Sequence, residues 1–286
     1  MILIIGKRKS GKTCYLYLML EKIRQHDLYG CHTIARNHEI SDAIDRREWI
    51  KPTIQNKEAK ELVRRSVIMN LSDRELDVSF NLPDISGGDL ERLARKLEYF
   101  QKQPPNVIKQ LLSTSNDPDE QLLLSICQAD GIIIMLDLDD PAIPEPYEVS
   151  NKFALGQTTP MSDTMFIRRL AEMMSLNYGL DIGNPVNIPV MVVLNKSDIH
   201  FKTDKVEDLY TEGDTAKTFF SKKYFTASNL LKDCFNPENI SYTWHSTVGN
   251  THTINNKSYP DYEYYIEIDG HIYTRSFINF IERIAK

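Results

Sequence analysis

Residues Met1 to Ile5 form an apolar run that leads directly into Gly6-Lys7-Arg8-Lys9-Ser10-Gly11-Lys12-Thr13. Apolar residues then recur at helical spacing between Thr13 and His26. This stretch therefore predicts a short buried strand, a loop that turns at glycines, and the start of a helix. Main-chain N–H groups of such a loop can wrap a polyphosphate, and the positive end of the helix dipole adds to the attraction. We therefore expect a phosphate-binding loop in an α/β fold.

The loop matches the pattern G-x-x-x-x-G-K-[ST] at each fixed position, and the pattern gives its residues separate roles. We expect Lys12 to reach the β- and γ-phosphates of a nucleotide and the Thr13 hydroxyl to bind Mg²⁺. Arg8 and Lys9 make the loop basic, which we interpret as general attraction for phosphate rather than direct catalysis. The residues predicted to bind the nucleotide here are Gly6, Arg8, Lys9, Ser10, Gly11, Lys12, Thr13 and Cys14.

Two further apolar runs, Gly131 to Leu136 and Ile188 to Leu194, are rich in branched residues and predict strands buried on both faces. Helical periodicity covers Ile167 to Leu176 and Phe277 to Ile284. Strands that alternate with helices predict an α/β domain with a mostly parallel sheet flanked by helices.

Two hairpins are also predicted. Ser66 to Leu71 and Leu76 to Leu82 have the composition of paired strands. Near the end, Tyr262 to Ile268 and His271 to Thr274 flank Asp269-Gly270, which is the signal of a type I′ turn. The last hairpin is expected to lead into a C-terminal helix.

Several charged segments extend this core. No linker rich in Gly, Ser or Pro separates them from the apolar strands, so we expect a single domain over residues 1–286. The predicted insertions lie near 28–62, 89–128 and 200–238, and a C-terminal extension lies near 250–286.

Asp84-Ile85-Ser86-Gly87 follows the strand predicted at Leu76 to Leu82. In a protein with a phosphate loop, an acidic residue at the end of a neighbouring strand completes the Mg²⁺ site. A glycine just beyond it lets a main-chain N–H meet the γ-phosphate. We assign these two roles to Asp84 and Gly87.

Asn195-Lys196-Ser197-Asp198 directly follows the strand predicted at Ile188 to Leu194, at the edge of a parallel sheet where ligands bind. The Asp198 carboxylate can accept hydrogen bonds from the ring N–H and the exocyclic amine of guanine, and adenine offers no such pair of donors. Asn195 can bridge the loop and the base, while the aliphatic stem of Lys196 can lie against the ring. The motif predicts a guanine site.

A further acidic stretch, Asp137-Leu138-Asp139-Asp140, ends a predicted core strand at the same edge. We interpret it as a solvated turn rather than a second metal site, because Asp84 already supplies the expected carboxylate.

Composition narrows the classes of function. The formal charge of -6 and the pI near 5.7 argue against electrostatic binding to nucleic acid. No apolar run reaches the roughly 18 residues of a membrane span, and no lipidation motif is present, so we expect a cytoplasmic protein without a membrane anchor. The four cysteines and seven histidines show no metal-ligand spacing, which sets zinc chemistry aside.

The three motifs in this order resemble the translation-factor-related class of P-loop GTPases, which includes the Ras-like small GTPases. The resemblance covers most of the chain up to about Gly249 and implies a Ras-like fold, GTP or GDP with Mg²⁺ as ligands, and guanine contacts from Asn195, Lys196 and Asp198. The insertions and the Tyr-rich terminal hairpin are similar to bacterial GTPases encoded with partner proteins in conflict or defence systems.

The resemblance also implies residues that no motif identifies. The family places a threonine between the first helix and the second strand, where it binds Mg²⁺ and the γ-phosphate. Thr53 in Pro52-Thr53-Ile54 is our candidate, with Thr33 as the alternative. Ser246 and Thr247 occupy the place of the short base-contacting loop, and His245 beside them is expected to be structural.

The resemblance implies hydrolysis of GTP to GDP and phosphate and a switch that effector or regulatory proteins read. Gly88 stands where Ras-like enzymes carry the glutamine that orients the attacking water, so intrinsic hydrolysis is expected to be slow. A GTP-binding scaffold with little or no hydrolysis stays open as the alternative. A P-loop kinase or ATPase is disfavoured by Asn195 to Asp198.

Overall fold

The computed structural model describes part of the chain. The described residues are 1–6, 10–25, 31–32, 38–49, 63–71, 74–82, 93, 96, 105–138, 167–168, 170–171, 174, 184–197, 213–246, 251–262 and 271–285.

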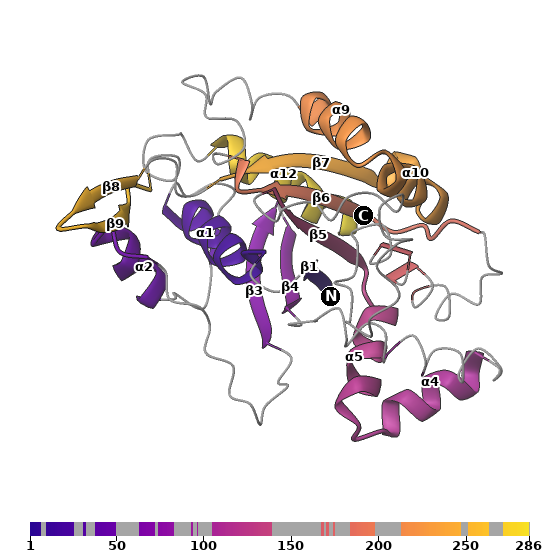
Figure 1. Ribbon diagram of the computed structural model, residues 1–286. Helices are drawn as coiled ribbons and strands as arrows, with labels where there is room; N and C mark the ends of the chain where they lie inside the picture. Colours follow the sequence, from indigo (N-terminus) through magenta and orange to yellow (C-terminus); the bar gives the residue numbers. More distant parts are fainter. Residues whose placement is uncertain are drawn as a thin grey trace, which may run out of the picture.

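A seven-stranded mixed sheet forms the centre of the molecule, in the order β2-β3-β4-β1-β5-β6-β7. Five neighbouring strands, from β4 to β7, are parallel, and β3 and β2 are antiparallel additions at one edge. This arrangement confirms the predicted α/β class and the mostly parallel sheet (Figure 1). The strands are β1 (Ile2–Gly6), β2 (Cys31–His32), β3 (Val63–Leu71), β4 (Arg74–Leu82), β5 (Gly131–Asp137), β6 (Val190–Asn195) and β7 (Ile240–His245).

Helices cover both faces of this sheet, which explains why its central strands read as unbroken apolar runs. On one face, Ile4 and Ile133 belong to a core shared with α1 (Lys12–Gln25) and α12 (His271–Ile284). The residues that alternate with them, such as Ile132, face a second core. Helices that supply this second core are α5 (Pro118–Cys127), α9 (Gly213–Lys223) and α10 (Phe225–Cys234).

Further short elements surround this framework. The 3₁₀ turn η4 (Pro237–Asn239) leads into β7, and α4 (Pro105–Thr114) precedes α5. Of the helix predicted from Ile167, five residues are described as helical, and four of them are buried: Ile167, Leu170, Ala171 and Met174. Among the helices of the described ranges, none is both long and apolar enough to cross a membrane.

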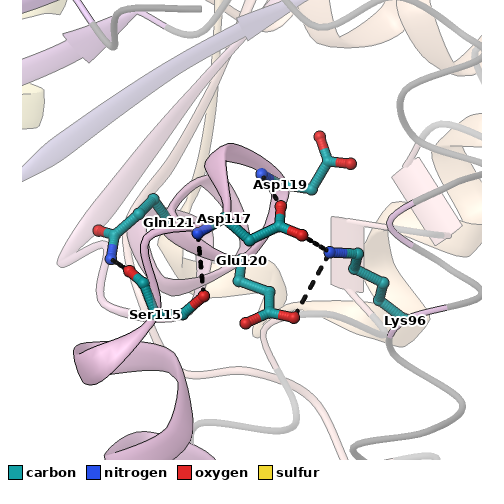
Figure 2. Close-up of polar contacts among 6 residues, drawn as sticks. All are labelled: Lys96, Ser115, Asp117, Asp119, Glu120 and Gln121. Carbon is teal, nitrogen blue, oxygen red and sulfur yellow. Dashed lines mark hydrogen bonds and ion pairs between the residues drawn. The ribbon is translucent and has the colours of Figure 1, made fainter.

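A cluster of polar side chains fixes the start of α5. Asp117 caps the helix by accepting a hydrogen bond from the Asp119 amide at 2.8 Å. Figure 2 shows Lys96 pointing from a separate segment toward Asp117 and Glu120, with which it forms ion pairs. The hydrogen bond from Lys96 and the bond from the Asp119 amide hold the pKa of Asp117 below its ordinary value. The cluster joins α5 to the helical residues at 93 and 96.

The predicted hairpin at residues 66–82 is confirmed, since β3 and β4 pair antiparallel throughout. The predicted hairpin around Asp269-Gly270 is wrong, because His271 to Thr274 are the first residues of α12 rather than a strand. A hairpin lies earlier, where β8 (Thr251–Ile254) pairs with β9 (Lys257–Pro260). Its turn residues, Asn255 and Asn256, have φ of 50° and 62°, which is the left-handed backbone that asparagine tolerates.

The β8–β9 hairpin packs with α2 (His38–Asp45), far from it in sequence (Figure 1). The Tyr262 hydroxyl donates to the Glu48 carbonyl at 2.6 Å, and Trp49 Nε1 donates to the Ser258 carbonyl at 2.8 Å. Beneath these contacts lies a small separate core of Tyr17, Leu18, Ile44 and Tyr262. The predicted insertion and the C-terminal extension therefore meet on the outer side of α1.

Candidate functional site

The predicted phosphate loop connects the end of β1 to the start of α1. Gly6 is the last residue of β1, and a Cβ placed there would lie 2.6 Å from both the Met135 carbonyl oxygen and Ser10 Oγ. Gly11 has φ +85°, and its Cβ would lie 2.5 Å from Asn195 Nδ2. Both glycines of the motif are therefore required by close approach, and Gly11 also by its backbone conformation.

Lys12 is the first residue of α1 and is only 7% exposed. Its ammonium donates a hydrogen bond to the Gly6 carbonyl at 3.0 Å, which closes the loop on itself. A buried lysine at a helix N-terminus is suited to binding an anion. The environment of Lys12 thus fits the role predicted from the motif.

Asn195, the last residue of β6 and the first of the predicted guanine motif, is hydrogen-bonded to the predicted phosphate loop. Its Nδ2 donates to the Ser10 carbonyl at 2.7 Å, and both residues are buried. The bond joins two segments that are 185 residues apart in sequence. The structure therefore brings together the first and third sequence motifs at the carboxyl edge of the sheet, as their order predicted.

Three polar residues form a row across this edge. Asp137, Asn195 and His245 are register partners on the neighbouring strands β5, β6 and β7. Side chains of register partners on neighbouring strands point to the same face of a sheet. The ring of His245 contacts Tyr15 of α1, so these three side chains lie on the face that α1 covers. In β5 and β6 these polar residues follow an otherwise apolar strand, whereas β7 also carries Ser241 and Thr243.

Asp137 and Lys196 form an ion pair with an Nζ–Oδ2 distance of 2.6 Å. The Asp137 side chain is 10% exposed and that of Lys196 is 32% exposed. The predicted solvated turn over residues 137–140 is wrong for Asp137, because its carboxylate is shielded and pairs with Lys196. Asp139 and Asp140 lie outside the described residues. Lys196 itself has φ 60°, which is uncommon for a side chain of this size.

His245 is buried beside the loop and packs edge-on against Tyr15, with 4.9 Å between ring centroids. Burial lowers the pKa of its imidazole to about 3, so the ring is neutral at physiological pH. Its carbonyl accepts a 3.0 Å hydrogen bond from Ser197 Oγ, which ties the end of β7 to the loop after β6. These contacts agree with the expected structural role.

Two hydroxyls at this edge are buried without a hydrogen-bond partner, those of Ser10 and Ser246. Both residues are only 1% exposed and both were predicted to contact the nucleotide. Burying a hydroxyl without a hydrogen-bond partner costs free energy. A polar ligand bound within hydrogen-bonding distance of either hydroxyl would recover that cost.

Thr13 and Cys14, in the first turn of α1, are partly exposed. Cys14 packs against the small core around Tyr17, and burial raises the pKa of its thiol to about 11. The thiol is therefore protonated, and any contact of Cys14 with a phosphate would come from its main-chain N–H.

The remaining predicted residues lie outside the described ranges. They are Arg8, Lys9, Thr53 with its alternative Thr33, Asp84, Gly87, Asp198 and Thr247. In sequence, Asp84 follows the last residue of β4 by two positions, and β4 is the strand next to β1. Asp198 follows the last residue of β6 by three positions.

No protein-family model matches the chain, and a search of curated proteins finds no similar sequence.

Proposed function

We propose that this chain is a Ras-like P-loop GTPase that binds a guanine nucleotide with Mg²⁺, hydrolyses GTP to GDP and phosphate, and switches conformation for partner proteins. The observation that carries the proposal is the bond between Asn195 and the Ser10 carbonyl. It brings a residue of the predicted guanine motif into contact with the predicted phosphate loop, which one nucleotide would have to span.

The described residues support the phosphate half of this proposal. Gly11 holds a conformation that few other residues adopt, Lys12 is buried in the loop, and Ser10 has a hydroxyl without a partner. Lys12 and the main-chain N–H groups at the start of α1 would hold the β- and γ-phosphates. Mg²⁺ would be held by Thr13, Asp84 and Thr53, and it would neutralise charge that develops on the phosphate oxygens.

The switch follows from the same roles. Thr53 and the main-chain N–H of Gly87 are proposed to contact the γ-phosphate, and in-line attack by water would release both. Effector or regulatory proteins would then distinguish the GTP and GDP forms. The cytoplasmic location is part of the same proposal.

A scaffold that binds GTP with little or no hydrolysis is the second candidate. The observation that favours it is Gly88, which follows Gly87 where the resemblance expects a water-orienting glutamine. Binding alone would then carry the signal.

The test is Mg²⁺-dependent binding of labelled GTP, GDP and ATP to the purified protein, with phosphate release followed in the same samples. Guanine-selective binding with release supports the GTPase, and selective binding without release supports the scaffold. Preference for ATP would contradict the role of Asp198 and favour a P-loop kinase or ATPase.

Lys12→Ala supplies the specific control. It removes a charge-assisted donor, and we expect a loss of affinity of about 10- to 100-fold. Lys217→Ala, on the exposed side of α9, removes the same charge elsewhere and is expected to leave binding unchanged. Equal binding by wild type and Lys12→Ala would contradict the assignment of the loop.

A further inference from the structure

The Asp137–Lys196 ion pair lies beside the proposed nucleotide site. Lys196 belongs to the predicted guanine motif, whereas Asp137 has no role in the proposed function. β5, which ends at Asp137, lies in the sheet between β1, which leads into the phosphate loop, and β6, which leads into the predicted guanine motif. Lys196 therefore reaches across from the guanine motif toward the phosphate loop when its ammonium meets Asp137.

Asp137 is a rigid anchor for this contact. It is the register partner of Asn195, and the next residue, Leu138, donates its main-chain N–H to the Asn195 carbonyl at 3.1 Å. Pairing between β5 and β6 thus continues to the last residue of both strands. The Asp137 carboxylate is almost fully shielded from solvent, so its position is fixed by the sheet.

Lys196, by contrast, needs such an anchor. Its φ of 60° places it in the left-handed region, which costs free energy for a residue with a long side chain. A lysine side chain that is one-third exposed has many rotamers, and the ion pair selects one of them. The selected rotamer carries the aliphatic stem across the sheet edge between the two loops.

Resting on the proposed function, we infer that Asp137 is a positioning residue that holds the Lys196 stem as a platform for the purine ring and so contributes to affinity for the base. The carboxylate acts through Lys196 and does not touch the nucleotide. The Lys196 ammonium in turn balances the charge of the shielded Asp137 carboxylate, which would otherwise repel a polyphosphate bound nearby.

This inference separates binding of the base from binding of the phosphates. Asp137→Asn keeps the size of the side chain and removes its charge. We expect it to weaken GDP binding about tenfold and to leave binding of tripolyphosphate, which has no base, within about twofold of wild type. Titration calorimetry with each ligand in the presence of Mg²⁺ measures both, and unchanged tripolyphosphate binding also shows that the variant is folded.

A double-mutant cycle tests whether Asp137 acts through Lys196. Lys196→Ala should weaken GDP binding, and Asp137→Asn combined with Lys196→Ala should be no weaker than Lys196→Ala alone. Asp233→Asn, an exposed change on α10, is the matched control and should bind like wild type.

Three results would overturn the inference: additive losses in the cycle, an equal loss for GDP and tripolyphosphate, or no loss in Asp137→Asn. If wild type binds guanine nucleotides selectively in the same assays, the proposed function stands in each of these three cases. A wild-type protein that binds no guanine nucleotide would overturn the proposed function and this inference together.

Discussion

The side-chain amide of Asn195 donates a hydrogen bond to the main-chain carbonyl of Ser10 at 2.7 Å, in a buried position. Asn195→Ala would leave that carbonyl without its partner, which costs about 1–3 kcal/mol. We therefore expect the free energy of unfolding to fall by this amount in urea titrations. Nucleotide affinity should fall as well, because the phosphate loop loses its support.

Asn229→Ala serves as the control for this change, since Asn229 is exposed on α10. It should be neutral in both measurements. A stable Asn195→Ala protein with unaltered affinity would show that the phosphate loop keeps its shape unaided.

Gly11→Ala is expected to deform the phosphate loop. The left-handed φ of +85° alone costs an alanine about 1–2 kcal/mol, and the new Cβ would meet Asn195 Nδ2. Thermal unfolding and nucleotide titration should both show a loss. In an Asn195→Ala background the steric part of the penalty disappears, so the cost of Gly11→Ala should be smaller there; equal costs in both backgrounds would contradict the close approach.

His245 predicts a dependence of stability on pH. The folded protein keeps the imidazole neutral down to about pH 3, whereas the unfolded chain protonates it below its ordinary pKa of 6.5. The contribution of His245 to the free energy of unfolding is therefore fully present above pH 6.5. It falls as the pH is lowered toward 3, by up to about 1.4 kcal/mol per pH unit.

Urea unfolding at a series of pH values between 7.5 and 5 measures this slope. His245→Phe keeps an aromatic ring against Tyr15 and removes the titrating group, so its slope should be smaller. Parallel slopes for the two proteins would mean that His245 becomes accessible to protons without unfolding.

Tyr262→Phe tests how the β8–β9 hairpin is attached. The change removes the hydroxyl that donates to the Glu48 carbonyl and keeps the buried ring, so we expect a cost of about 1 kcal/mol. Hydrogen exchange should show faster opening of amides in residues 251–262, with the β5 and β6 amides unaffected. Uniform protection across the chain would mean that the hairpin does not depend on this bond.

Much of the sheet could be predicted from the sequence, because a parallel strand buried on both faces is a continuous apolar run. Ile132 to Leu136 and Val190 to Leu194 are such runs, and both are fully buried strands. The phosphate loop stays a prediction, and the structure adds that Gly11 has a left-handed φ of +85° and that Lys12 is buried at the start of α1.

The C-terminal hairpin was misplaced because two turn signals compete in this region. Asp269-Gly270 has the stronger intrinsic signal, but the apolar spacing that continues through Phe277 and Ile281 buries one side of a helix that starts at His271. The Asn255-Asn256 turn has a weaker signal, and packing of Tyr262 against α1 and α2 supports its hairpin.

The ion pair of Asp137 with Lys196 could not be predicted from spacing. It depends on β5 and β6 being neighbours that end level with each other, a relation that emerges only from the sheet register. The Asn195–Ser10 contact could be predicted in part: the motif predicts that Asn195 reaches a loop, but it does not identify the Ser10 carbonyl as the acceptor.

The distances in sequence that these contacts span have a consequence for the order of folding during synthesis. The predicted phosphate loop is synthesised among the first residues, but Asn195, which donates to its Ser10 carbonyl, is synthesised 185 residues later. Tyr262, which donates to the Glu48 carbonyl, follows Glu48 by 214 residues. Loops of this length close late, after local helices and hairpins have formed. A nascent chain would therefore carry an unsupported loop at residues 6–13 until β6 (Val190–Asn195 of 286 residues) has been made. Under the proposed function, nucleotide binding should not begin before that point.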